Sequence, residues 1–254
     1  MSDIEKIKII DSLGQEFTLP KTFELRSEPL SKKSSLLGVA FVHGAKDVSD
    51  GMYNPRIVTV SGKIWASSDY EYNEKWDAIA EHLIKENIRI QNRGRQINCK
   101  KVQDISHDYP SNLGYHYGEV GISFLCLDPF WYSANAVQKQ FSVTGSPYQF
   151  QFDVGGKVET YPLIIITNSD VNSDFTLKNI TDDGREFEIS DSGAVQGTEI
   201  QIDCKEGTVV RDGETNLISV FSGLFLRLLG GRTNQFEYTG ANCNITFQYK
   251  NAWI

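Results

Sequence analysis

The sequence has little of what usually marks a catalytic or membrane-bound protein. It contains four histidines and two methionines in 254 residues. No apolar run approaches the ~18 residues that a membrane-spanning helix needs. The short motifs of nucleotide, zinc and acyl chemistry, GxGxxG after a strand, GxxxxGK[ST], HExxH and GxSxG, do not occur. We therefore expect no enzyme, no cofactor, no metal site and no membrane association.

The chain also lacks an excess of basic residues. Its formal net charge is −8, whereas a protein that holds nucleic acid through its phosphates needs a basic face. The stretch "NRGRQINCKK" at 92–101 is locally basic. Lysine and arginine also protect exposed sheet edges from pairing, so this stretch is interpreted as a solvated strand edge.

Cysteine is scarce and scattered. Cys99, Cys126, Cys204 and Cys243 form no CxxC motif and no histidine pair lies nearby, so zinc has little support. Each lies among apolar residues, and we expect buried, reduced thiols. Disulfides stay open as an alternative. The start, "MSDIEKIKII", has no signal-peptide pattern, and the expectation is synthesis in a reducing cytoplasm.

Most of the sequence has the composition and the alternating pattern of β-strands. Aromatic residues make up 11% of the chain, which favours β structure. Alternating stretches separated by turn residues predict hairpins around "DSLG", around Asp183-Gly184 and around Glu206-Gly207. "LFLRLLGG" and "NITFQYKN" are predicted as further strands near the end.

One segment is predicted as a helix, at about 73–86. Its apolar residues follow the i, i+3, i+4, i+7, i+8 spacing of an amphipathic helix. Asn73 is the expected N-cap, and His82 lies off the apolar stripe and is expected at the surface. The stripe, which we expect to pack on a sheet of the same chain, is Trp76, Ile79, Ala80, Leu83 and Ile84.

A long stretch at about 24–55 has weak periodicity and is rich in Ser, Gly, Asp and Lys. It is predicted as an irregular or extended arm, because loops of this length in compact domains usually serve a purpose. Ordering such an arm in a monomer costs conformational entropy that burial on a neighbouring subunit would offset. The residues proposed for that contact are Leu36, Leu37, Val39, Phe41 and Val42.

The stretch "FLCLDPFWYS" at 124–133 marks a domain boundary. Before it, strands mix with a helix; after it, strands follow at the spacing of a β-sandwich. Proline ends the strand. We therefore predict domains at 1–130 and 131–254, with a crease between them filled by the aromatic members of the junction Asp128, Pro129, Phe130, Trp131 and Tyr132.

Three sets of residues suggest chemistry or binding, each with a plainer explanation. The acidic pairs Asp182/Asp183 and Asp203/Glu206 fall at hairpin turns, where aspartate is common for backbone reasons. His107 and His116 flank a loop but lack a third metal ligand. Aromatic rings can stack on sugars, although packing is their commoner role. The candidates for such stacking are Trp131, Tyr132, Tyr148 and Trp253.

The order of these parts resembles the distal tail proteins of long-tailed, non-contractile bacteriophages. The matching elements are the Asp-Pro-aromatic junction at 128–132, Ile202-Asp203-Cys204, the strand Thr208-Val209-Val210, Asp212-Gly213 before an apolar run, and the ending "NITFQYKNAWI". The organisation matches over nearly the whole chain, and the motifs match from about residue 119 onward.

This resemblance implies a structural role in the tail tip of a virion assembled in the host cytoplasm. It implies an N-terminal β-sandwich with a flanking helix and a belt-like arm, and a C-terminal galectin-like β-sandwich. It further implies homohexameric rings, single or stacked, that enclose the channel for DNA without binding it specifically. The implied partners are the tail tube protein, the tape measure protein, and a tail hub, tail-associated or tail fibre protein. The alternative is a carbohydrate-binding host-recognition module, which the fold alone does not establish.

Overall fold

The computed structural model describes residues 6–34, 36–38, 45–47, 52–83, 85–108, 116–169 and 174–254. The chain divides into two compact units, Met1–Trp131 and Tyr132–Ile254, so the boundary lies one residue beyond the predicted position. The architecture is mainly β, as predicted. No helix among the described residues is long and apolar enough to cross a membrane.

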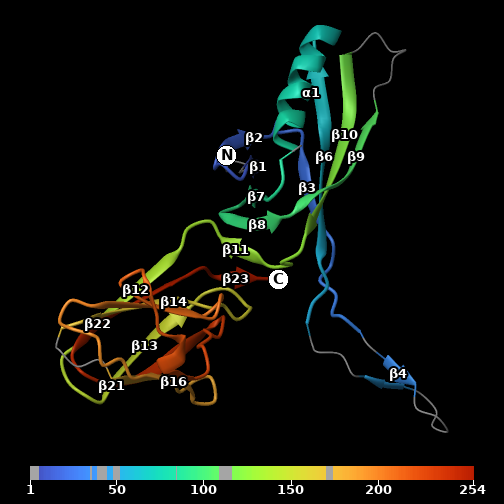
Figure 1. Ribbon diagram of the computed structural model, residues 1–254. Helices are drawn as coiled ribbons and strands as arrows, with labels where there is room; N and C mark the ends of the chain where they lie inside the picture. Colours follow the sequence, from blue (N-terminus) through green and yellow to red (C-terminus); the bar gives the residue numbers. More distant parts are fainter. Residues whose placement is uncertain are drawn as a thin grey trace. The chain divides into compact units, whose positions relative to one another are not determined.

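The described residues of the first unit form two larger antiparallel sheets, a two-stranded ribbon and one helix (Figure 1). One sheet has the order β2-β1-β7-β8, and its N-terminal hairpin is the predicted one. The other has the order β3-β6-β10-β9 and is built on two eleven-residue strands. The elements are β1 (Lys8–Ile10), β2 (Glu16–Thr18), β3 (Glu24–Ser27), β6 (Arg56–Ala66), α1 (Asp69–Leu83), β7 (Ile88–Asn92), β8 (Arg95–Cys99), β9 (Lys101–Asp108) and β10 (His116–Cys126).

The helix begins four residues before the predicted start, so Asn73 is not its cap. The backbone N–H of Glu71 donates to the Ser68 hydroxyl at 3.2 Å, and the Glu71 carboxylate accepts from the Ser67 N–H at 2.7 Å. This is close to a capping box, whose Ser-x-x-Glu pattern stands in the sequence at 68–71. Hydrogen bonds from Lys75 and Ser67 lower the pKa of Glu71 to about 2.

The predicted arm is more regular than expected. Its first residues form β3, which pairs with β6. Backbone pairing continues beyond this sheet. Lys32 and Tyr53 form an antiparallel β-bridge, and the Lys33 N–H donates to Met52 O at 2.8 Å. Further along, β4 (Leu36–Gly38) pairs with β5 (Ala45–Asp47). Residues 28–55 therefore contain a two-stranded antiparallel ribbon that prolongs the β3–β6 pair.

The second unit is a sandwich of two antiparallel sheets, ordered β12-β22-β14-β17-β18-β19 and β13-β21-β15-β16-β20. The predicted hairpins at Asp183-Gly184 and Glu206-Gly207 join β15 to β16 and β17 to β18. The strands of these two sheets are β12 (Val137–Val143), β13 (Tyr148–Val154), β14 (Leu163–Asn168), β15 (Phe175–Asn179), β16 (Arg185–Ile189), β17 (Glu199–Asp203), β18 (Thr208–Arg211), β19 (Thr215–Asn216), β20 (Phe221–Gly223), β21 (Arg232–Gly240) and β22 (Cys243–Tyr249). Two short strands, β11 (Trp131–Ser133) and β23 (Ala252–Trp253), lie outside them.

The core of this sandwich is aromatic. Phe150, Phe152, Phe236 and Phe247 lie with ring centroids 5.0 to 5.9 Å apart, the separation at which aromatic pairs attract beyond their buried area. Phe150, Phe152 and Phe236 come from β13 and β21 of one sheet, and Phe247 comes from β22 of the other. The two sheets therefore share one apolar core.

The segment "LFLRLLGG" (224–231) is not a strand, contrary to the prediction. It is irregular and is held by long-range polar contacts. Leu228 and Thr160 exchange backbone hydrogen bonds at 2.8 and 2.9 Å, and Arg227 makes a forked contact with the buried Asp182 carboxylate at 2.8 to 3.1 Å. Before it stands a short 3-10 helix, η1 (Ile218–Val220), which was also not predicted.

Candidate assembly surfaces

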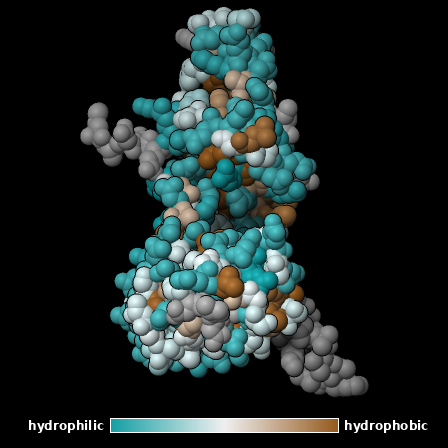
Figure 2. Space-filling model, turned by 60° about the vertical axis from the view of Figure 1, so that its left-hand side comes forward, coloured by the Kyte–Doolittle hydropathy of each residue, from teal (hydrophilic) through white to brown (hydrophobic). Residues whose placement is uncertain are grey.

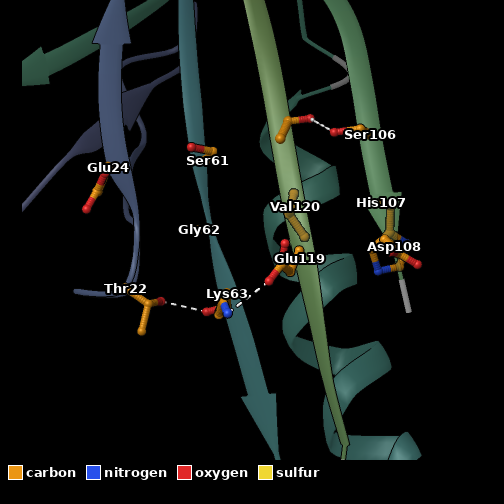
Figure 3. A pocket seen from close by; sticks show the side chains of 11 residues that line it. Thr22, Glu24, Ser61, Gly62, Lys63, Ser106, His107, Asp108, Glu119 and Val120 are labelled. Carbon is orange, nitrogen blue, oxygen red and sulfur yellow. Dashed lines mark hydrogen bonds and ion pairs between the residues drawn. The ribbon is translucent and has the colours of Figure 1, made fainter. Parts of the chain in front are cut away.

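One face of the β3-β6-β10-β9 sheet is lined by small and polar side chains (Figure 3). In the register, Glu24 lies beside Ser61, and Ser61 beside Gly121, which in turn lies beside Ser106. The alternate residues point the other way, toward the core: Val60, Ile122 and Phe124 are fully buried. A shallow hollow of about 630 Å³ lies on this polar face, between Thr22, Lys63, Ser106 and Glu119 among others.

The charges on this polar face are mostly acidic. Lys63 pairs with Glu119 at 2.9 Å, and the hydrogen bond that the Lys63 ammonium donates to Glu119 raises the pKa of Lys63. Arg26 lies 3.9 Å from Glu24. Asp104 and Asp108 stand opposite Ser123 and Glu119 in the register and are exposed. The register thus places four acidic and three basic residues on this face: Glu24, Asp104, Asp108 and Glu119 with Arg26, Lys63 and Lys101.

The two edge strands of this sheet, β3 and β9, each pair with only one other strand among the described residues. β3 pairs with β6 alone, and β9 pairs with β10 alone. Every pairing in the sheet is antiparallel, so β3 and β9 run in opposite directions. An open edge carries unpaired N–H and C=O groups that can accept a strand from another chain.

The ribbon holds part of the predicted contact set. Leu36 and Leu37 lie in β4, opposite Asp47 and Lys46 of β5. Val39, Phe41 and Val42 lie outside the described residues. The role of all five in a subunit interface stays a prediction.

The helix lies against its own sheet in the first unit (Figure 1). Trp76 stacks on His107 of β9 with ring centroids 4.6 Å apart, and Ile79 is 1% exposed. Ala80 is half-buried, Leu83 ends the helix without a described side chain, and Ile84 lies outside the described residues.

Two contacts of the helix were not predicted from the sequence. Tyr72, four residues before Trp76 and 2% exposed, hydrogen-bonds and stacks with His107. The i, i+4 spacing to Trp76 was the available signal. His82 is not an ordinary surface histidine, because it is half-buried and stacks on Phe17 of β2 at 4.9 Å.

Gly118 of β10 lies under the Tyr72 ring. A Cβ at this position would overlap the Tyr72 hydroxyl and lie 3.0 Å from the backbone oxygen of Asp108. We expect Gly118→Ala to push Tyr72 away from His107 and to destabilise the first unit by about 1–3 kcal/mol, the usual cost of overpacking. Calorimetry of the full chain measures this loss of stability. Gly121→Ala is the control, since its Cβ meets a Ser106 hydroxyl that can rotate away; equal effects would contradict the role of Tyr72.

The predicted junction residues make contacts within each unit. The Asp128 carboxylate accepts from Phe130 N–H at 3.3 Å across Pro129. Phe130 packs edge-on against Tyr53 with centroids 5.4 Å apart. Trp131 is 8% exposed. In the second unit, the Tyr132 ring lies 5.9 Å from the Lys205 ammonium. That these aromatics fill a crease between domains stays a prediction.

The aromatic candidates for sugar stacking are not exposed platforms. Trp131 is buried, while Tyr132, Tyr148 and Trp253 are half-buried, and Tyr148 packs against the sandwich core. A ring that binds a sugar must offer an open face. The described positions of these four residues therefore give the carbohydrate alternative no support.

The predicted acidic pairs, Asp182/Asp183 and Asp203/Glu206, contain aspartates that stabilise a turn or form an ion pair. Asp203 accepts backbone hydrogen bonds from Lys205 and Glu206, both at 2.9 Å. Asp182 is buried against Arg227, whose pKa is raised mainly by the hydrogen bond to Asp182. Within the described ranges no group of three or more metal-binding side chains comes together.

The face of the molecule in Figure 2 is mostly polar. On the face in Figure 2, apolar side chains form small separate groups among hydrophilic ones. Five large apolar residues of the first unit are more than half exposed among those described: Leu13, Tyr70, Met52, Leu127 and Trp65, at 78%, 73%, 60%, 56% and 53%. Trp65 stacks on Tyr117 of β10 at 4.9 Å, on the same side of the sheet as Lys63 and Glu119.

Comparisons with known proteins connect this chain to phage tails. Residues 155–253 match the family model for the C-terminal domain of siphovirus-type tail components. The crystal structure of the Dit (gp 19.1) protein of phage SPP1, described as a paradigm of hub adsorption apparatus in phages infecting Gram-positive bacteria, aligns with a TM-score of 0.74 at 14% identity over 98% of this chain and 99% of that one. The baseplate of phage p2 in its activated conformation aligns with a TM-score of 0.48 at 11% identity, over 98% of each chain.

No curated protein sequence matches the chain. The structural alignment establishes a shared fold over both units, and the family model covers most of the second unit. The resemblance to distal tail proteins predicted from the sequence is thereby confirmed: residues 155–253 match the model for the C-terminal domain of siphovirus-type tail components, and the fold is similar to that of the SPP1 Dit protein.

Proposed function

We propose that this protein is a structural component of a phage tail tip, in which six copies form a ring that links the tail tube to the hub and surrounds the path of DNA. The observation that carries the proposal is the four-stranded antiparallel sheet of the first unit, open at both edges, in a chain that shares the SPP1 Dit fold over 98% of its length.

The sheet suits pairing between identical copies. Joining β9 of one copy to β3 of the next uses two different surfaces of each subunit, which is a heterologous interface that closes into a ring. Because the sheet has an even number of strands and alternates in direction, a β9–β3 junction is itself antiparallel. Such a ring would contain one continuous antiparallel barrel with no open edge, which removes the aggregation hazard of both edge strands. The number six comes from the resemblance.

The polar face of the sheet suits the inner wall of a DNA channel. Its four acidic residues outnumber its three basic ones, and Arg26 and Lys63 have carboxylate neighbours. A wall of this kind repels phosphates, so DNA can pass without being held. The small residues Ser61, Gly121 and Ser106 keep the wall smooth near the hollow in Figure 3.

The ribbon and the second unit would serve the outer contacts of the ring. An isolated two-stranded hairpin is marginally stable in water, so the β4–β5 ribbon gains stability by lying on a neighbouring subunit. The second unit would lie outside the ring and face other tail proteins. We propose the tail tube protein, the tape measure protein and a hub or fibre protein as neighbours, within a virion assembled in the host cytoplasm.

Mass photometry of the purified full chain tests the proposal. The chain has a mass of 28.6 kDa, and a closed six-fold ring gives a peak near ~170 kDa, with a multiple of it if rings stack. Negative-stain images should then contain rings with a central hole. A protein that stays monomeric up to high micromolar concentration, or that closes as a two-fold dimer, contradicts ring formation by β9–β3 pairing.

A further inference from the structure

We propose that Cys99 and Cys126 form a disulfide that links the two sheets of the first unit once the protein leaves a reducing environment. Cys99 ends β8 in one sheet, and Cys126 ends β10 in the other. Their Sγ atoms are 2.9 Å apart, and both residues are at most 1% exposed. The thiols are free in this structure.

The backbone around the pair supports the same conclusion. Lys100 N–H donates to Leu125 O at 2.8 Å, so the residue after Cys99 is hydrogen-bonded to the residue before Cys126. The two Sγ atoms need to approach by only about 0.9 Å to reach the disulfide bond length of about 2.05 Å. The crosslink can therefore form without unfolding either sheet.

The remaining two cysteines provide an internal comparison. Cys204 follows β17 and Cys243 begins β22, and strand β14 lies between those two strands in the sheet. Two strand spacings amount to about 9–10 Å, beyond the reach of a disulfide. Burial raises the pKa of Cys204 to about 12, and we expect both thiols to stay reduced.

The reaction needs an external oxidant, for which we name a small disulfide such as oxidised glutathione. One cysteine thiolate attacks a glutathione sulfur, forms a mixed disulfide and releases one reduced glutathione. The second cysteine thiolate attacks the mixed disulfide, forms the Cys99–Cys126 bond and releases the second. Two electrons pass from the cysteines to the oxidant, and the two cysteine protons end on the two glutathione thiols.

The environment of the pair makes this reaction slow. The hydrogen bond to Cys126 and burial raise the pKa of Cys99, so little thiolate is present at neutral pH. Access is through the exposed bend at Lys100, next to Cys99. A pair of this kind stays reduced during synthesis and oxidises afterwards. That timing rests on the proposed virion function, whereas the pairing itself does not.

The test uses the purified full chain, incubated natively and, in parallel, refolded from denaturant, each with oxidised glutathione. Titration of free thiols in denaturant should fall from four per chain to two, and peptide mapping without reduction should contain the 99–126 crosslink. Calorimetry should place the unfolding transition of the first unit about 10 °C higher in the oxidised than in the reduced protein, with the second unit unchanged.

Two variants separate this pair from the other cysteines. Cys204→Ala should still lose two thiols on oxidation, and Cys126→Ala should lose none. Four free thiols in the refolded oxidised wild type would overturn the proposal, as would a stable glutathione adduct at Cys99 or crosslinks between chains. Ring formation, measured separately on the same oxidised and reduced samples, reports on the proposed function without affecting this outcome.

Discussion

Removing residues 36–47 and joining 35 to 48 through Asn-Gly is expected to abolish the ring and leave a folded monomer. The deletion takes away β4 and β5 and keeps the pairing of Lys33 with Met52 and of β3 with β6. Asn-Gly supplies the backbone angles of a tight hairpin turn. The remaining ribbon therefore still closes, and the sheet of the first unit is unaffected.

The physical reason for the lost ring is the position of the deleted segment. β4 carries two leucines on a two-stranded ribbon, beyond the end of the sheet. Such a ribbon is marginally stable alone, and its ordering entropy is offset when it lies on another subunit. In mass photometry the peak near ~170 kDa should give way to a monomer peak, while calorimetry detects little change in either unit.

The control is a substitution at an exposed apolar residue elsewhere in the same unit. Leu13, 78% exposed in the β1–β2 turn, is replaced in Leu13→Ser, which should keep the ring. The finer variant Leu36→Ser with Leu37→Ser should weaken the ring without shortening the chain. Rings that persist in the deletion variant at the wild-type concentration would show that edge pairing alone holds the subunits together.

The parts of the fold that could be predicted from the sequence are those fixed by local chemistry. The hairpins at Asp183-Gly184 and Glu206-Gly207 were predicted correctly, because aspartate and glycine accept the positive φ of a tight turn; Asp183 and Gly184 have φ of 51° and 72°. The start of α1 is also encoded locally, by the capping pattern of Ser68 and Glu71, whereas the apolar period that begins at Trp76 predicts a later start.

The parts that could not be predicted depend on contacts between distant residues. The ribbon has a weak apolar period, and its regularity comes from backbone pairing of residues about 20 apart, such as Lys32 with Tyr53. "LFLRLLGG" has strand-like composition, yet Arg227 turns to the buried Asp182. Likewise Tyr72 and Trp76 are placed by His107, which is about 30 residues further on. No local pattern encodes such partners.

The same limit applies to the candidate assembly surfaces. The Asp-Pro junction could be located because a change of pattern and a proline coincide there. The polar face of the β3-β6-β10-β9 sheet could not, because it combines residues from four strands in a register that only the folded chain sets. Alternation predicts that Ser61 and Lys63 share a face, but not that Gly121 and Glu119 lie beside them.

Substitution of the buried Asn234 of β21 is expected to lower the stability of the second unit more than most other single substitutions there. Asn234 is 0% exposed. Its Oδ1 accepts from Leu229 N–H at 2.9 Å and from Asn179 Nδ2 at 3.3 Å, and its Nδ2 donates to Leu229 O at 3.0 Å and to Arg232 O at 3.3 Å. One side chain thus fixes the turn that leads from the irregular 224–231 segment into β21.

Asn234→Ala should destabilise the second unit by about 3 kcal/mol, because both backbone groups of Leu229 lose their partner in a partly buried site and each unpaired group costs about 1–3 kcal/mol. For a unit of this size that is a fall of roughly 10 °C in its unfolding temperature, which calorimetry of the full chain resolves. The matched control is Gln235→Ala, an exposed amide one residue along the same strand, expected within about 0.5 kcal/mol of wild type. If the two variants unfold at the same temperature, the 224–231 segment is held by Arg227–Asp182 and the Thr160–Leu228 bridge, and the amide is dispensable.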